Sequence, residues 1–167
     1  DGDVPLRSGV IDSTRAGTVA TAASNERARW VVRFREAPGW PQRGALETAG
    51  ARVVAPLPGQ AFLVDLPPGR ALALSGIAGV DWAAPYLPQD KIAPEIAQAP
   101  DSEPAEDVAV VVHLFDDVDP HAVAAELSAS GLRVVGSGRG GRVGRVVVLA
   151  TPEERRTRGG ALAESGA

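Results

Sequence analysis

Cysteine and methionine are both absent from this 167-residue chain, and only two histidines are present. Without thiols the chain can form neither a disulfide framework nor a cysteine-based metal site. Serine hydrolases and metal sites usually need at least one histidine in a defined place, and two residues leave little material for either. We therefore expect no catalytic residue, no metal ligand and no cofactor.

Aromatic residues, excess basic charge and long apolar runs are also scarce. Aromatic residues make up 4% of a chain that is 44% hydrophobic, so any core is built mostly from Val, Leu and Ala. The net charge of −4, with both signs mixed, gives no footprint for nucleic acid. No apolar run reaches the roughly 18 residues of a membrane span. The missing methionine indicates a processed product or a fragment, and the length suits one medium domain or two small ones.

What the chain does contain is an internal repeat. Sliding the sequence against itself by 81 positions aligns similar residues in the same order, with three extra residues allowed in one turn. The aligned segments are Trp30–Phe34 with Val111–Phe115, Leu46 with Leu127, Gly50–Val54 with Gly131–Val135, and Ala61–Pro68 with Arg145–Pro152. The sequence therefore predicts two copies of one module.

Each module reads as strand, helix, strand, strand, helix, strand. Glycine at the end of the first helix suits a left-handed C-terminal residue, and Asp119 followed by Pro120 is typical of a helix start. The expected strands of the first module are Trp30–Arg35, Ala51–Ala55, Ala61–Leu66 and Val80–Ala83, and those of the second are Val108–Phe115, Leu132–Gly136 and Val143–Ala150. This order is the βαββαβ or ferredoxin-like sandwich, with two helices on one face of an antiparallel sheet and the other face free.

The expected fold class is thus α+β, with two tandem ferredoxin-like antiparallel sandwiches. Residues 1–28 form a flexible N-terminal arm, 29–96 the first module, 97–106 a Pro- and acid-rich linker, and 107–167 the second module. The second module ends before its last strand, which leaves a sheet edge and apolar surface unpaired.

Several short sequence motifs resemble catalytic or cofactor-binding motifs, but their surroundings do not support those roles. "GVIDST" (Gly9–Thr14) resembles the aspartate strand of a subtilisin-like protease, but no histidine lies nearby to complete a triad. "GSGRGG" (Gly136–Gly141) matches a dinucleotide-binding fingerprint, yet a strand comes after it where a helix is required, so a hairpin turn is the better interpretation. His113 is either a half-buried imidazole bonded to a neighbour or a pH switch, and His121 a solvated residue.

The run "RWVVRFREAPGWPQRGALETAGARVVAPLPGQAFLVDLP", with "GVDWAAPYLPQDKIAPEI" after it, resembles the N-terminal prodomain region of secreted bacterial subtilisin-like serine proteases. The most specific part is the signature V-x-W-x-x-x-Y-x-P-x-x-K. It is formed by Val80, Trp82, Tyr86, Pro88 and Lys91. The second module is similar to the next module along the chain in such proteins, so the resemblance covers about residues 29–167.

The resemblance implies an intramolecular chaperone and inhibitor, secreted or at the cell surface, with its signal peptide removed. Its partner would be a subtilisin-like catalytic domain, in cis or in trans, and no nucleic acid, membrane or small-molecule ligand is expected. Pro85, Pro88 and Pro94 keep the segment after the fourth strand extended, which suits docking along a groove. The contact candidates are Trp82, Tyr86, Pro88 and Lys91, with the exposed sheet faces behind them.

Two alternatives stay open at this point. Trp82 and Tyr86 could instead cap the first module's sheet against the second module. The chain could also be a free-standing interaction or scaffold module, or a small-ligand-binding domain, because a ferredoxin-like fold alone does not choose among functions.

Overall fold

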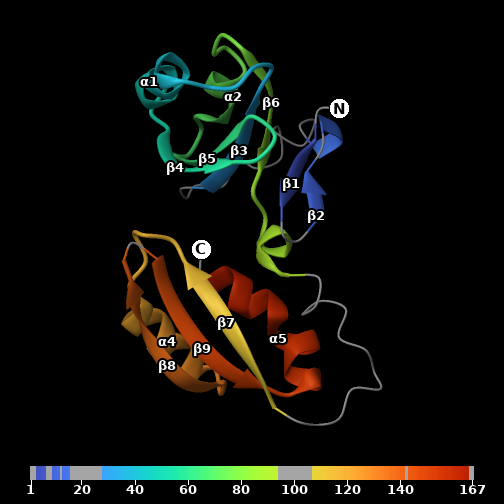
Figure 1. Cartoon of the computed structure of the whole chain (residues 1–167), viewed down its shortest axis with the longest axis vertical. Coiled ribbons are helices and arrows are strands. Elements are labelled where there is room, and N and C mark those ends of the chain that lie inside the picture. The colour runs from blue at the N-terminus through green and yellow to red at the C-terminus, as the bar shows by residue number, and fades with distance from the viewer. Residues whose placement is uncertain are drawn as a thin grey trace. The chain divides into compact units, whose positions relative to one another are not determined.

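The computed structural model describes residues 3–6, 9–11, 13–15, 28–93, 107–141 and 143–165. The fold is α+β with three antiparallel sheets. The chain divides into two compact units, Asp1–Leu87 and Pro88–Ala167 (Figure 1). The sequence placed residues up to 96 in the first module, whereas the structure divides the chain after Leu87. The linker expected at 97–106 lies outside the described residues.

The first unit contains a four-stranded sheet with two helices. Its elements are β3 (Ala28–Phe34), α1 (Trp40–Thr48), β4 (Arg52–Leu57), β5 (Ala61–Leu66), α2 (Ala71–Leu74) and β6 (Val80–Pro85). The strands lie in the order β4-β5-β3-β6, and all neighbours are antiparallel. The four strands expected from the sequence are all present, but the second helix is a single turn.

The core of this unit lies between the sheet and its helices. Trp30, Val32 and Phe34 project from β3 toward Leu46 of α1 and Leu74 of α2. Phe34 meets Phe62 edge to face, with ring centroids 6.1 Å apart. These side chains alternate along the strand, as expected for one buried face of a sheet.

The opposite face of this sheet is also buried, so the prediction of a free face is wrong for the first unit. Val31 and Ala84 are completely buried, and Leu63 is 2% exposed. The physical reason lies in the strands themselves, because β5 reads "AFLVDL" and carries apolar residues on both faces. A strand of this kind needs cover on each side, whereas a half-solvated strand alternates with polar residues.

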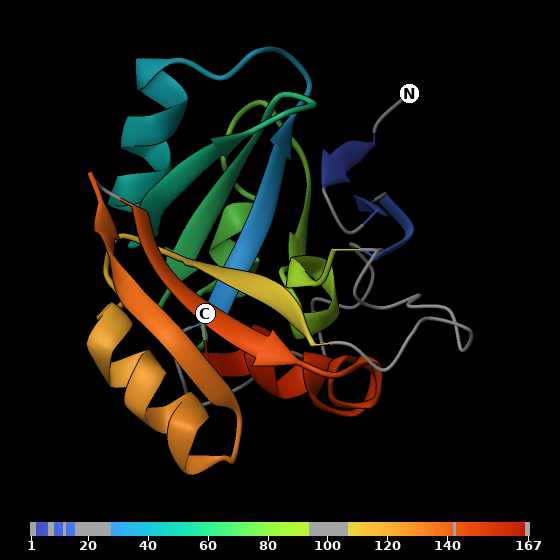
Figure 2. The ribbon, with the colours of Figure 1, turned by 60° about the horizontal axis from the view of Figure 1, so that its bottom comes forward.

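Part of the segment expected to be an arm without regular structure forms a hairpin. β1 (Val4–Leu6) pairs with β2 (Gly9–Ile11), and Val4 and Ile11 are buried. The hairpin lies on the side of the sheet away from α1 (Figures 1 and 2). It contacts the β4–β5 turn so closely that a Cβ atom on Gly59 would lie 2.7 Å from the Asp3 carbonyl oxygen. The prediction failed because three-residue strands are too short to show a period.

The second unit contains a three-stranded sheet. Its elements are η2 (Pro88–Lys91), β7 (Val108–Leu114), α4 (Pro120–Ala129), β8 (Arg133–Gly140), β9 (Val143–Ala150) and α5 (Pro152–Ser165). The strand order is β7-β9-β8, and among the described residues no fourth strand joins this sheet. Both long helices lie on the same face of the sheet (Figures 1 and 2).

The core of the second unit is aliphatic. Val110 and Leu114 of β7 and Val146 and Val148 of β9 pack with Val123 and Leu127 of α4. The predicted start of α4 is confirmed: the side chain of Asp119 accepts a hydrogen bond of 3.1 Å from the His121 backbone N–H, and Pro120 is the first helical residue.

Two local features recur at matching places in both units. The pairing of β4 with β5 shifts register between Val53 and Ala55, and that of β8 with β9 shifts between Val134 and Gly136, 81 positions later. Helices α1 and α4 are each followed by a glycine with positive φ, +89° at Gly50 and +87° at Gly131. Glycine suits both positions because it carries no Cβ.

The register of the first strands corrects the alignment derived from the sequence. Trp30 lies opposite Val64, and Val110 lies opposite Val148, so Trp30 corresponds to Val110 and not to Val111. The slip of one residue places every side chain of the strand on the other face. The sequence does not reveal this slip, because β7 is almost uniformly apolar and fits either register. In addition, α4 has one more residue than α1, so the offset between the units returns to 81 residues by Leu127.

Gly144 of β9 is expected to be sensitive to substitution. A Cβ atom there would lie 2.9 Å from the Pro120 Cγ and 3.1 Å from the Leu114 Cβ, so Gly144→Ala would press the strand against the start of α4. We expect a loss of about 1–3 kcal/mol in the free energy of unfolding of the second unit. Hydrogen exchange at β9 amides measures this, since all three tryptophans lie before residue 83 and report on the first unit.

Gly138→Ala is the matched control, because a Cβ at Gly138 of β8 meets no atom within 4 Å. Equal protection of β9 in wild type and Gly144→Ala would contradict the close contact.

Candidate interaction surface

The aromatic candidates Trp82 and Tyr86 lie at the end of the first sheet. Trp82 lies in β6, opposite Arg33 of β3. It is 6% exposed, so its ring is covered. Tyr86 comes directly after β6, is half-buried, and donates its backbone N–H to the Arg29 carbonyl oxygen at 2.8 Å. Tyr86 therefore continues the pairing of β6 with β3 by one more residue.

The other two candidates lie beyond the division between the units. Pro88 and Lys91 begin and end the 3₁₀ turn η2, which packs against α5. The prediction of an extended segment is therefore wrong at these residues. Proline fixes φ near −65°, which suits a 3₁₀ turn as well as an extended chain, so the prolines did not decide between them. Pro94, which was expected to prolong the segment, lies outside the described residues.

A row of charged residues crosses the first sheet on the face away from the helices. Asp65 of β5 lies opposite Arg52 of β4 on one side and Arg29 of β3 on the other. Asp65 is 8% exposed, and the Arg52 Nη2 lies 3.4 Å from its Oδ2. Opposite charges on adjacent strands stabilise the pairing of those strands. The Asp65 carboxylate is therefore held in place by the sheet and is not presented to solvent.

The second sheet has the free face that the sequence predicted for both modules. Val111 of β7 and Val143 of β9 are 44% and 49% exposed and lie on this face. Exposed His113 and Arg145 lie opposite each other on the same face, which carries neither α4 nor α5. Isolated exposed valines are ordinary, but several on one sheet form an apolar surface with a basic margin.

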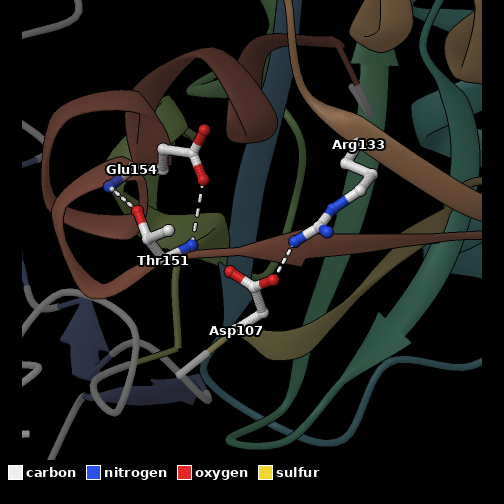
Figure 3. A network of polar contacts seen from close by, with 4 residues as sticks. All are labelled: Asp107, Arg133, Thr151 and Glu154. Atoms are coloured by element: carbon white, nitrogen blue, oxygen red, sulfur yellow. Dashed lines mark hydrogen bonds and ion pairs between the residues drawn. The ribbon is translucent and has the colours of Figure 1, made fainter. Parts of the chain in front are cut away.

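Polar contacts fix one end of this sheet (Figure 3). Arg133 of β8 forms an ion pair with Asp107, which immediately precedes β7, and the pair spans the central strand β9. At the start of α5, the Thr151 N–H donates to the Glu154 Oε2 at 2.9 Å, and the Glu154 N–H donates to the Thr151 Oγ1 at 3.2 Å. This reciprocal capping box defines where β9 ends and the helix begins.

The glycine-rich stretch is a hairpin, as predicted. Gly136–Gly140 belong to β8, Gly141 adopts φ +66°, and β9 begins at Val143. Arg139 is turned toward the start of α4, where its guanidinium donates to the carbonyl oxygens of Asp116 and Val118. No helix begins at this turn, so the arrangement lacks the helix N-terminus that a dinucleotide site requires.

Ser137 and His121 form a contact that sequence reasoning missed. The Ser137 Oγ lies 3.2 Å from the His121 Nδ1, on the face of β8 that meets α4. A catalytic serine needs a base that is itself oriented by a third group. Among the described side chains, none is hydrogen-bonded to the other ring nitrogen of His121. The contact links β8 to α4. The only feature of the sequence that draws attention to Ser137 is its place between Gly136 and Gly138.

His113 is neither half-buried nor placed where Val32 lies in the first unit. It is exposed and corresponds to Arg33 once the register of β7 is corrected. Within the described part of the chain, no group of three or more His, Asp or Glu side chains could hold a metal ion. No described helix is both long and apolar enough to cross a membrane.

Comparison with family models places a match over the first unit. Residues 5–87 match the family model of a domain of unknown function, DUF8729. This range contains most of the β1–β2 hairpin together with the whole of the four-stranded sheet, and it stops where the first unit ends. No curated protein and no solved structure matches the chain.

Proposed function

We propose that the chain is the non-catalytic propeptide region of a subtilisin-like serine protease, acting as intramolecular chaperone and inhibitor through protein contacts. The observation that carries the proposal is the strand order of the first unit. Its four strands, numbered along the chain, lie in the order second, third, first, fourth, with α1 after the first strand and α2 after the third. This supports a ferredoxin-like sandwich, the fold that the resemblance to protease prodomains implies.

The second unit supports a second copy of the same module without its last strand. Its order of first, third, second strand matches three of the four positions, and α4 and α5 come after the first and third strands. The shared register shift and the shared glycine after the first helix favour duplication over chance likeness. We infer two tandem ferredoxin-like modules.

The exposed face of the second sheet is the surface best placed to meet a catalytic domain. Unlike the corresponding face of the first unit, it is open among the described residues, and its Val111, Val143 and Arg145 offer both apolar area and charge. The buried Trp82 is assigned a supporting role in β6, whereas the partly exposed Tyr86 and Lys91 remain candidates for direct contact.

A chaperone of this kind acts by mass action. A catalytic domain with many non-local contacts folds over a high barrier. A partner that binds only the native-like state lowers the free energy of that state. Such a partner raises the yield of refolding without a nucleophile or cofactor of its own.

The test uses the whole chain and a denatured subtilisin-like catalytic domain encoded beside it. We expect the chain, added in excess during refolding, to raise the protease activity recovered after dilution about tenfold, and to inhibit the folded protease reversibly in a separate assay. Tyr86→Ala and Val143→Lys should each weaken the effect. Trp40→Ala, which changes an 81% exposed ring on α1 outside the proposed contact, is the control.

The rival function, a free-standing scaffold module, predicts a different outcome. The chain would then neither inhibit the protease nor change its refolding. The coding sequence beyond residue 167 is informative in the same way: Asp, His and Ser motifs of a protease support the propeptide, and further repeats support the scaffold.

A further inference from the structure

One edge of the second sheet differs from its counterpart in the first. β3 is a central strand that pairs with β5 on one side and β6 on the other. β7 occupies the same place in the second unit but pairs only with β9 among the described residues. Within the part of the chain that the structure describes, no strand pairs with the other edge of the seven-residue strand β7.

The sequence of this edge strand lacks the features that commonly keep strands from associating. Protected edges carry charged side chains, proline or bulges. The outer strand of the first sheet, β4, contains Arg52, Pro56 and a register shift, and the outer strand β8 also has a shift. β7 reads "VAVVVHL", has no Lys, Arg, Asp, Glu or Pro, and pairs with β9 in unbroken register.

We propose that the free edge of β7 binds the same edge of a second copy of this chain, joining two three-stranded sheets into one. The proposal does not depend on the propeptide function. Two identical edges related by a twofold axis pair antiparallel, which is the direction in which β6 pairs with β3. A twofold axis at Val111 matches the two strands along their whole length.

The residues brought together by this register are compatible. Val111 meets Val111 of the second copy, and the other pairs are Val110 with Val112, Ala109 with His113, and Val108 with Leu114. None of these pairs places like charges opposite each other. A charged residue at the axis would instead lie opposite the same charge in the second copy. On the open face, Val147 lies opposite Val111, so an apolar row Val147–Val111 continues across the axis into the second copy.

The experiment measures the oligomeric state of the whole chain by sedimentation over a range of concentrations. We expect wild type to form a concentration-dependent dimer and Val111→Lys to weaken the association about fivefold or more, because two ammonium groups meet at the axis. Val135→Lys is the matched control: it places the same charge at a 54% exposed position of β8, the outer strand on the other side of the sheet, and the dimer should be retained.

A cysteine variant keeps the proposal testable if Val111→Lys folds poorly, and a mixing experiment extends the test if Val111→Lys folds well. The chain contains no cysteine, so Val111→Cys introduces one thiol, which should form an intermolecular disulfide on oxidation, whereas Val135→Cys should not. Mixing Val111→Lys with Val111→Glu should restore a heterodimer that neither variant forms alone. A wild-type monomer at all concentrations, or a dimer lost in Val135→Lys and kept in Val111→Lys, would overturn the proposal.

Discussion

Trp30→Ala is expected to destabilise the first unit by about 3–5 kcal/mol, the cost of removing a large aromatic side chain from a packed core. Trp30 is 2% exposed and packs in the cluster between the sheet and α1. A loss of this size is a large fraction of the stability of a small domain, so partial unfolding at 25 °C is the expected phenotype. Chemical denaturation followed by circular dichroism, with hydrogen exchange at β3 and β5, measures the change.

Trp40→Ala is the matched control for this substitution. The Trp40 ring is 81% exposed, and its only described ring contact is with the Arg43 guanidinium, 5.6 Å from the ring centroid. Losing an exposed cation–π contact costs about 0.5–1 kcal/mol. Equal losses in the two variants would show that the core is not centred on Trp30.

Asp65→Leu is expected to cost the first unit about 2–4 kcal/mol, because it removes a buried carboxylate that lies opposite Arg29 and beside Arg52. The main part of the loss should come from Arg29, since the Arg52 side chain is 46% exposed and solvent screens it. Denaturation curves for the single variant give the size of the loss.

The second unit suggests how that loss can be reversed. In the second unit, the position equivalent to Asp65 is occupied by Leu149, which lies opposite Arg133. The position equivalent to Arg29 is occupied by Ala109. The double variant Arg29→Ala, Asp65→Leu should therefore recover at least half of the loss. Asp107→Ala, which breaks the exposed pair with Arg133, should cost less than about 1 kcal/mol. Additive effects of the two substitutions in the first unit would rule out coupling between Arg29 and Asp65.

Local signals in the sequence were sufficient for the order of strands and helices within the two larger sheets, β3 to β6 and β7 to β9. Glycine before a polar-to-apolar change marked the ends of α1 and α4, and Asp119–Pro120 marked the start of α4, because caps and turns depend on a few neighbouring residues. The hairpin at "GSGRGG" was predicted for the same reason, because the apolar side chains directly after the turn already identify β9 as a strand.

Features that depend on residues far apart along the chain could not be predicted from local signals. The register of β7, the cover on the second face of the first sheet, and the β1–β2 hairpin each required knowing which strands lie side by side. In a run such as "VAVVVHL", either face can be the buried one, and only pairing with Val146 and Val148 of β9 selects it.

The candidate site shows the same division. Its aromatic and proline residues could be named from their order along the chain, but burial of Trp82 and the 3₁₀ turn at Pro88 came from the packing of β6 and α5. The amino-acid sequence by itself thus determined the α+β fold class and the division into two parts, since turns and strands are specified by residues close together along the chain. Which surfaces stay open to a partner was decided by the folded molecule, since solvent exposure is a property of neighbours that lie far apart along the chain.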